Sequence, residues 1–225
     1  MLFPLLLLST VIAAGGLPPV APVGVPALDA FASAWSKIDA YSVTVAVRET
    51  AGKNVQDRTY ALTFAKPANE TIVITGGAGR GGKVVWGGGD SVLGSPPGLL
   101  SGLKIRVPIA DARVTSLRGD TVAMASFAWL LDHFRQTAGV RTQAPGPLVN
   151  GNPTTAISLA VADPRTDDGL TQEVLIIDNL TNLPVSGRSY IDADVVKDVR
   201  FSDVSVRSAG LPAAKSNAAP APAGH

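Results

Sequence analysis

A glycine-rich stretch at residues 77–82 (Gly-Ala-Gly-Arg-Gly-Gly) is the first place where this sequence could do chemistry. It fits the G-x-G-x-x-G spacing, and with Lys83 it approaches a phosphate-binding loop. Such loops bind phosphate because they open a helix whose N-terminal amides point at the ligand. Here the strand-like run Val84-Val85-Trp86 follows, and Val84 stands where a Ser or Thr would meet magnesium. The motif therefore predicts a hairpin loop and no nucleotide site.

His133 is the next residue with catalytic potential, and the only other histidine is the last residue, His225. One imidazole cannot make a multi-histidine metal site, and no H-E-x-x-H spacing occurs. Asp132 beside His133 would suit a hydrolase triad, but there is no G-x-S-x-G elbow to carry the nucleophile. We expect His133 to lie on a helix surface near the C-terminal end, where its charge favours the helix dipole. We predict no catalytic residue.

Acidic residues cluster in the last third of the chain and could suggest calcium or a carboxylate pair. The run at 163–169 lacks the twelve-residue calcium loop with its terminal Glu. The absence of cysteine removes disulfides, thiolate metal sites and cysteine nucleophiles. We therefore expect solvated turns and a polar strand face, with no metal and no cofactor. The acids concerned are Asp163, Asp167, Asp168, Asp192, Asp194 and Asp198.

The elements that would position these groups run in the order helix, strands, helix, strands. Apolar residues at helical spacing predict helices at 26–40 and 120–137, with Gly139 as the stop of the second. Alternating residues predict strands; they are expected at 41–50, 60–64, 70–75, 83–86, 103–109, 154–161, 173–178, 185–191 and 195–206. Without β-α alternation, the pattern indicates a mainly antiparallel α+β fold. We expect a curved sheet, an unclosed β-barrel, covered by two or more helices.

The two ends differ in composition from this domain, which we place at 27–208. Residues 1–16 form an apolar run ending in small residues, which predicts a Sec-type signal peptide; the run is shorter than the ~20 residues of a membrane span. Residues 17–26 are a Pro-rich linker, and 209–225 are an Ala/Pro tail expected to be disordered. These features predict a periplasmic or secreted protein, and the lack of cysteine predicts no lipid anchor.

Charge and hydropathy limit the classes of function. The 19 basic and 18 acidic residues are scattered, so the basic stripe of a nucleic-acid binder is missing. Hydrophobic residues make up 46% of the chain, whereas side chains suited to catalysis are sparse. This composition fits either an ordinary packed core or a curved sheet that leaves an apolar cleft for a hydrophobic ligand.

Several short motifs resemble those of the periplasmic lipoprotein carrier family (LolA-like, outer membrane lipoprotein-sorting proteins). A strand ends in a basic residue before proline at Lys66-Pro67, a second strand follows, and Lys83-Val84-Val85-Trp86 matches the Asp-Gly-Lys-x-x-Trp pattern of the family. Gly81 stands at the Asp position of that pattern. The closing strands show similar segments at 174–178, 183–184, 190 and 201–204. The resemblance extends over about residues 27–207.

The resemblance implies an unclosed barrel whose interior takes acyl chains. The implied cavity would be lined by one face of the strands and by the inner helix faces. The candidate liners are Val45, Val47, Leu62, Phe64, Ile74, Trp86, Phe127, Leu130 and Phe134. Lys66 stands where the family has an Arg that latches the helical lid, although Lys lacks the planar, multi-donor fork of Arg.

The leading hypothesis is therefore a monomeric, exported binding protein for lipid or the acyl chains of lipoproteins, with a carrier role across the periplasm as its expected use. Its expected partners are lipid or an acylated protein, with transient contact to a membrane or an envelope protein. The alternative is a regulatory interaction module of the same fold without bound lipid, since a related branch of the fold senses envelope stress. A hydrolase centred on His133 is the third hypothesis.

Overall fold

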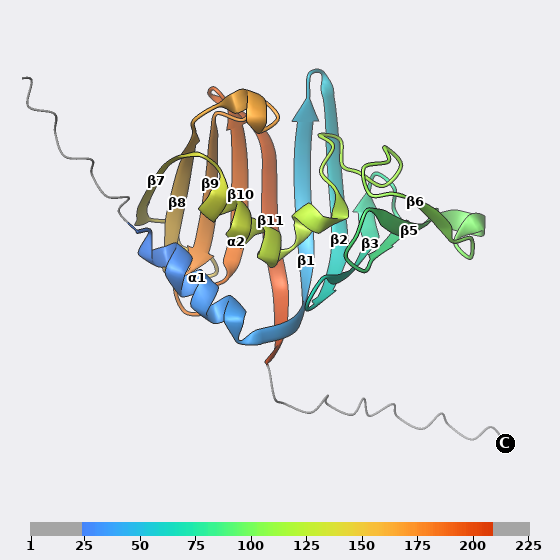
Figure 1. Ribbon diagram of the computed structural model, residues 1–225, viewed down its shortest axis with the longest axis horizontal. Coiled ribbons are helices and arrows are strands. Elements are labelled where there is room, and N and C mark those ends of the chain that lie inside the picture. The colour runs from blue at the N-terminus through green and yellow to red at the C-terminus, as the bar shows by residue number, and fades with distance from the viewer. Residues whose placement is uncertain (1–23, 209–225) are drawn as a thin grey trace, which may run out of the picture.

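The computed structural model describes residues 24–208 and shows one sheet of eleven antiparallel strands (Figure 1). Their order across the sheet is β6-β5-β4-β3-β2-β1-β11-β10-β9-β8-β7. The first six strands are β1 (Ile38–Ala51), β2 (Asn54–Ala65), β3 (Asn69–Gly77), β4 (Lys83–Trp86), β5 (Ser91–Ser95) and β6 (Ile105–Pro108). The other five are β7 (Gly139–Pro145), β8 (Thr154–Val161), β9 (Gln172–Asp178), β10 (Pro184–Ile191) and β11 (Asp194–Ser208). The unclosed, curved antiparallel sheet expected from the sequence is confirmed.

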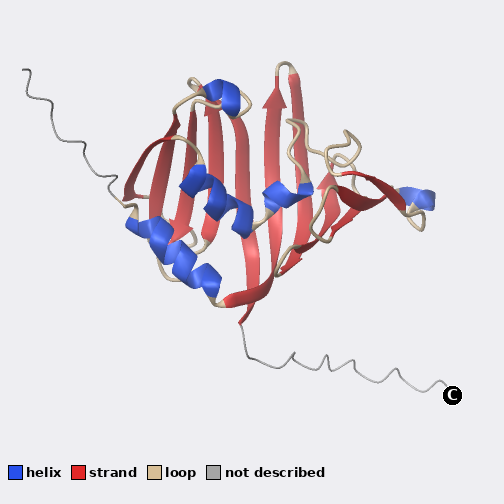
Figure 2. Ribbon diagram, in the orientation of Figure 1, coloured by secondary structure: helices blue, strands red, loops and turns tan. Residues whose placement is uncertain are grey.

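The helices all lie on one face of this sheet (Figure 2). They are α1 (Pro26–Ser36), α2 (Phe127–Gln136) and the 3-10 helix η2 (Val122–Ala125); two further 3-10 turns are η1 (Gly98–Leu100) and η3 (Pro164–Thr166). No helix in the described part of the chain has the length and apolar character needed to cross a bilayer. The predicted signal peptide, most of the predicted linker and the predicted tail lie outside the described residues.

The central pair β1 and β11 joins the two ends of the domain. Tyr41, Val43, Val45 and Val47 alternate along β1, and the first three are buried on the helix-covered face, as a period of two requires. The long β1–β2 hairpin and the β1–β11 pairing then place both flanking groups of strands around this axis. The glycine-rich stretch at 77–82 forms the turn between β3 and β4, as expected for a hairpin loop.

Both predicted helices are shorter than their apolar patterns indicated. The first ends at Ser36, because the alternating run that begins at Ile38 already belongs to β1. The second is divided at Ser126, whose extended backbone (φ −81°, ψ 151°) interrupts the helix. The Ser126 hydroxyl accepts a hydrogen bond from the Trp129 amide at 3.2 Å, so Ser126 caps α2.

Two edge-side strands were not predicted. β5 lies in a segment rich in Gly and Pro, whose composition predicts an irregular loop. β7 begins at Gly139, which was expected only to stop the helix. A Cβ at Gly139 would lie 2.1 Å from the carbonyl oxygen of Ala160 on β8, so the close approach of these two strands requires glycine here.

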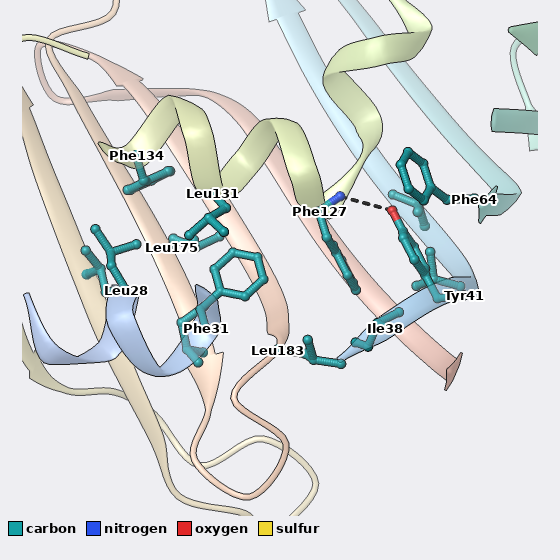
Figure 3. Close-up of a cluster of buried hydrophobic side chains, with 14 of the residues drawn as sticks. Leu28, Phe31, Ile38, Tyr41, Phe64, Phe127, Leu131, Phe134, Leu175 and Leu183 are labelled. Carbon is teal, nitrogen blue, oxygen red and sulfur yellow. Dashed lines mark hydrogen bonds between the residues drawn. The ribbon is translucent and has the colours of Figure 1, made fainter. Parts of the chain in front are cut away.

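The main core fills the space between α1, α2 and the middle of the sheet (Figure 3). Phe31 from α1 packs against Phe127 from α2 with ring centroids 6.4 Å apart, and Phe127 stacks on Tyr41 of β1 at 4.5 Å. The Tyr41 hydroxyl also accepts a hydrogen bond from the Phe127 amide at 3.0 Å, which satisfies a buried donor at the start of α2. A smaller cluster, built on Val92, Val107 and Val122, lies beneath η2.

Candidate functional site

An apolar cavity of about 380 Å³ lies on the helix-covered face of the sheet, over β1–β6. Its cover is the irregular stretch at residues 109–125, called here the cover segment, which ends in η2. The apolar wall comes from both sides: Val47, Tyr60, Ile72, Ile74, Val84, Ile105 and Val107 from the sheet, and Val114, Val122 and Met124 from the cover segment. A space of this size and lining can hold an apolar chain.

Glycine and small side chains leave this volume open. Gly79, Gly82 and Gly94 form part of the floor. A Cβ on Gly94 would lie 3.4 Å from Cγ1 of Val114, so the cover segment approaches the sheet closely at this glycine. The cover segment presents no aromatic ring to the cavity; its apolar contribution comes from Val114, Val122, Met124 and Ala125. The sheet and its cover are therefore in contact around a volume that their side chains do not fill.

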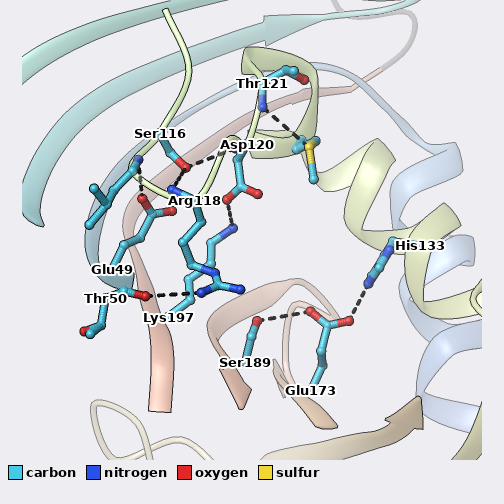
Figure 4. Close-up of polar contacts among 12 residues, drawn as sticks. Glu49, Thr50, Ser116, Arg118, Asp120, Thr121, His133, Glu173, Ser189 and Lys197 are labelled. Carbon is cyan, nitrogen blue, oxygen red and sulfur yellow. Dashed lines mark hydrogen bonds and ion pairs between the residues drawn. The ribbon is translucent and has the colours of Figure 1, made fainter. Parts of the chain in front are cut away.

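One end of the cavity is polar and fixes the cover segment to the sheet (Figure 4). The Glu49 carboxylate on β1 accepts a hydrogen bond from the Leu117 amide at 2.9 Å. Lys197 of β11 forms an ion pair with Asp120. Arg118 donates to the carbonyl oxygens of Thr50 at 3.2 Å and Asp168 at 3.0 Å.

Burial and charge set the protonation of this polar end. Burial raises the pKa of the Glu49 carboxyl, although the positive charge of Lys197 opposes the shift. Burial would also raise the pKa of Asp120, but the charge and hydrogen bond of Lys197 outweigh it and lower that pKa. The lowered pKa favours the ionised form of Asp120, whereas Glu49 takes up a proton more readily than an exposed glutamate.

Arg58 on β2 offers a cation in the cavity wall. Its Nη1 donates to the Thr115 carbonyl oxygen at 3.3 Å, which again ties the cover segment to the sheet. Its Nε is buried and has no hydrogen-bond partner among the described residues. A buried donor without a partner is unfavourable, and the planar guanidinium suits a carboxylate or phosphate. Arg58 thus places a positive charge in the cavity wall, while its Nε lies out of reach of the cavity.

The structure divides the nine liners predicted from the sequence between several places. Val47 and Ile74 line the cavity. Five others lie in the filled core beneath α1 and α2: Val45, Leu62, Phe64, Phe127 and Phe134. Leu130 borders a space of about 80 Å³ beneath α2. Trp86 packs against the small cluster under η2, and its indole N–H donates to the Gly89 carbonyl oxygen at 2.8 Å.

Sequence reasoning missed most of the wall that the cavity has. Ile72 lies two residues before Ile74 on the same face of β3, and Arg58 lies two residues before Tyr60 on β2, so strand parity could have identified both. Most of the cover segment carries no such signal, because residues 110–119 have neither helical nor strand periodicity.

Lys66, the predicted latch, contacts the end of α1. Its Nζ donates to the Trp35 carbonyl oxygen at 2.8 Å and lies 4.7 Å from the centroid of the Trp35 ring. A cation at this position satisfies a terminal helix carbonyl and favours the helix dipole. Lys66 therefore joins the C-terminal end of β2 to α1, the helix that covers the main core. Its role as a latch stays a prediction.

His133 does not lie on an exposed helix surface, as the sequence had suggested. Its side chain is 10% exposed, and its Nε2 pairs with the Glu173 carboxylate of β9 beneath α2 (Figure 4). Trp129 stacks on the imidazole at 4.4 Å, and Ser189 donates to the other Glu173 oxygen at 3.1 Å. Burial would lower the pKa of His133, but the hydrogen bond and charge of Glu173 raise it.

The Asp167 carboxylate lies next to the His133–Glu173 pair. One ligand atom each from His133, Asp167 and Glu173 lies within 4.8 Å of the others. The Asp167 side chain was expected in a solvated turn, yet one of its oxygens is buried without a partner among the described residues. An imidazole and two carboxylates could hold a divalent cation, and residues 40 positions apart in sequence gave no spacing signal for it.

Comparison with known proteins finds no matching family profile and no matching curated protein. Solved structures with a similar fold include a LolA superfamily protein from Nitrosomonas europaea, at 13% identity over 84% of this chain and 96% of that one, with a TM-score of 0.35. LprF from Mycobacterium bovis is 13% identical over 83% of this chain and 95% of its own, with a TM-score of 0.43. MucB in the Pseudomonas aeruginosa MucA/MucB complex is 13% identical over 85% of this chain but only 59% of the MucB chain, with a TM-score of 0.47.

These similarities concern the fold. The chain itself is an open antiparallel sheet with α1, α2 and η2 on one face.

Proposed function

We propose that this chain is a non-enzymatic binding protein that holds one apolar chain, from a lipid or an acylated protein, between β1–β6 and the cover segment. The observation that carries the proposal is the cavity of about 380 Å³ with its mainly aliphatic wall. This volume falls in the lower part of the roughly 300–1,000 Å³ typical of ligand sites. It suits a single chain better than the several acyl chains of a bulky lipid.

The energetics favour an apolar ligand without any catalytic group. Burying a methylene is worth about 0.8 kcal/mol, so ten methylenes give about 8 kcal/mol before the costs of association. The guanidinium of Arg58 in the cavity wall adds a cation for an anionic head. A fatty acid, or a phospholipid with one chain inserted, has both features.

The proposal places the protein in the periplasm or outside the cell. It is supported by the apolar leader at residues 1–16 of the sequence. A carrier role, in which the ligand is passed from one membrane or protein to another, belongs to the same proposal.

The proposal is tested by titrating the purified protein with a fluorescent fatty acid. Ile74→Trp should weaken binding at least about tenfold, because the indole would occupy the volume that the chain needs. Val73→Trp is the matched control: it adds the same ring to the same strand on the opposite face. Native mass spectrometry of the wild type should also show bound lipid after purification.

Either of two results would reject the proposal. One is a wild type that binds no fatty acid and carries no lipid. The other is an Ile74→Trp variant that binds as tightly as the wild type. The alternative, an interaction module without lipid, is favoured by the core under α1 and α2, which leaves beneath α2 a space of only about 80 Å³. It predicts the first of these results.

A further inference from the structure

The connection between β5 and β6 ends in an apolar tip that the domain does not bury. We call residues 96–105 the hairpin tip; it includes η1 and protrudes past the edge of the sheet (Figure 1). Leu99 is fully exposed, Leu100 is 61% exposed, Leu103 49% and Ile105 38%. Four large aliphatic side chains within seven residues form a continuous apolar feature. Exposed apolar groups gathered in this way mark an interaction site, whereas single ones need no explanation.

The segments that lead to and from the hairpin tip carry mostly positive charge. Between Glu70 and Asp111 the sequence holds four basic residues, Arg80, Lys83, Lys104 and Arg106, and a single acid, Asp90. Asp90 lies in the β4–β5 turn, at the opposite end of these strands.

Three of these basic residues lie close to the hairpin tip, whereas Arg106 donates a hydrogen bond to Ser91 at the other end of β5. Lys83 pairs with Ser95 across β4 and β5, immediately before the tip, and Lys104 lies within it. A Cβ at Gly81 would lie 3.4 Å from Cβ of Pro97, so the turn that carries Arg80 packs against the tip. The apolar residues are thus surrounded by cations and have no acidic neighbour in these segments.

The hairpin tip is also continuous with the cavity. Pro96, Pro97 and Ile105 belong to the tip and line the cavity at the same time. A chain that leaves the cavity at this end would therefore pass directly onto the exposed leucines.

We propose that the hairpin tip docks on the surface of an anionic phospholipid bilayer, with Leu99 and Leu100 inserted among the acyl chains and the basic residues facing the head groups. A protruding apolar tip with a basic surround combines the two forces that hold peripheral proteins on membranes. This deepens the proposed function, because it gives the cavity a route for lipid entry, but docking itself needs no ligand in the cavity.

Co-sedimentation with vesicles of phosphatidylcholine and phosphatidylglycerol in equal parts tests the proposal. Replacing both Leu99 and Leu100 by Ser should lower the partition coefficient about a hundredfold, about tenfold for each leucine. The matched control replaces Leu148 and Leu180 by Ser; these are 71% and 69% exposed and lie in turns at the other side of the sheet. It should bind as the wild type does.

The basic residues are tested separately. Lys104→Gln should lower binding to the mixed vesicles about fivefold and leave binding to pure phosphatidylcholine vesicles unchanged. All substituted side chains are exposed, so thermal unfolding of each variant should match the wild type.

Failure of docking and failure of the cavity can be told apart. If the wild type does not bind vesicles, or if the leucine variant binds as well as the wild type, the docking proposal is wrong. If the leucine variant loses vesicle binding but still binds soluble fatty acid, both proposals are supported. If vesicle binding depends on the leucines while the wild type binds no fatty acid, docking stands and the cavity function falls.

Discussion

Replacing Glu70 by Gln should make the protein more stable at neutral pH. Glu70 on β3 is 1% exposed, and neither of its carboxylate oxygens has a hydrogen-bond partner among the described residues. Its cross-strand neighbours on the same face are Phe64 and Trp86, which offer no compensating charge. Burial raises the pKa of this carboxyl from 4.5 to about 8.

The sign and size of the effect follow from proton linkage. Because the pKa is higher in the folded state, folding takes up a proton between pH 4.5 and 8, and the free energy of unfolding falls as the pH rises through this range. At 1.36 kcal/mol per pH unit, the whole window amounts to about 5 kcal/mol as an upper bound, and about 3 kcal/mol of this is lost by pH 7. Gln is neutral throughout and avoids this loss.

Urea unfolding at pH 5 and pH 8 measures both quantities. The wild type and Glu70→Gln should have similar unfolding free energies at pH 5. At pH 8 the variant should be more stable by up to a few kcal/mol. Asp194→Asn, a substitution of an exposed acid, is the control and should follow the wild type at both pH values. A variant that is less stable than the wild type at pH 8 would show that Glu70 has a partner and that the reasoning is wrong.

Two further predictions concern contacts that join the helices to the sheet. Lys66→Met should lower the free energy of unfolding by about 1 kcal/mol and speed hydrogen exchange of the α1 amides, because the Trp35 carbonyl loses its cation. Lys66→Arg should restore most of the protection from exchange. Lys53→Met, in the exposed β1–β2 turn, is the control and should change neither quantity. Glu173→Gln should lower the free energy of unfolding, measured in urea, by about 1–3 kcal/mol at pH 5.5 and by less at pH 8.5. The pKa of His133 is raised in the folded state, so the ion pair of His133 with Glu173 is complete below about pH 6.5 and is lost as His133 deprotonates. An equal cost at both pH values would contradict the ion pair.

The parts of the fold that were predicted are those with a local periodic signal. The alternation Tyr41-Val43-Val45-Val47 predicts both the strand and its buried face, and β1 shows both. The boundary errors arise where two signals overlap. The helical pattern of 120–137 continues through Ser126, and only the capping hydrogen bond to Trp129 shows that the chain turns there. β7 escaped prediction because an edge strand need not bury either face, so its sequence does not alternate.

The site was less predictable than the fold for a physical reason. Strand parity indicates which face a residue occupies, and Val47 and Ile74 do lie on the cavity wall. It does not indicate what covers that face. Phe64 has the same parity as Tyr60, yet it packs in the core because aromatic rings from α1 and β1 fill the space above it, whereas the cover segment leaves space above Tyr60. The His133–Glu173 contact joins residues 40 positions apart and likewise required the fold.

The contrast between the two halves of the sheet explains why the cavity lies where it does. The half beneath α1 and α2 is filled by rings that contact one another in series, from Trp35 through Phe64 and Tyr41 to Phe127 and Phe201. The half beneath the cover segment has a glycine-containing floor and aliphatic side chains above it, so the two layers leave a space between them.

Regular helices with aromatic faces thus close one half of the sheet. The irregular cover segment spans the other half. It is held to the sheet by polar contacts at one end and by the packing of Val122 on Val92 and Val107. The cavity between the sheet and the cover segment extends to the hairpin tip, where Pro96, Pro97 and Ile105 belong to its lining.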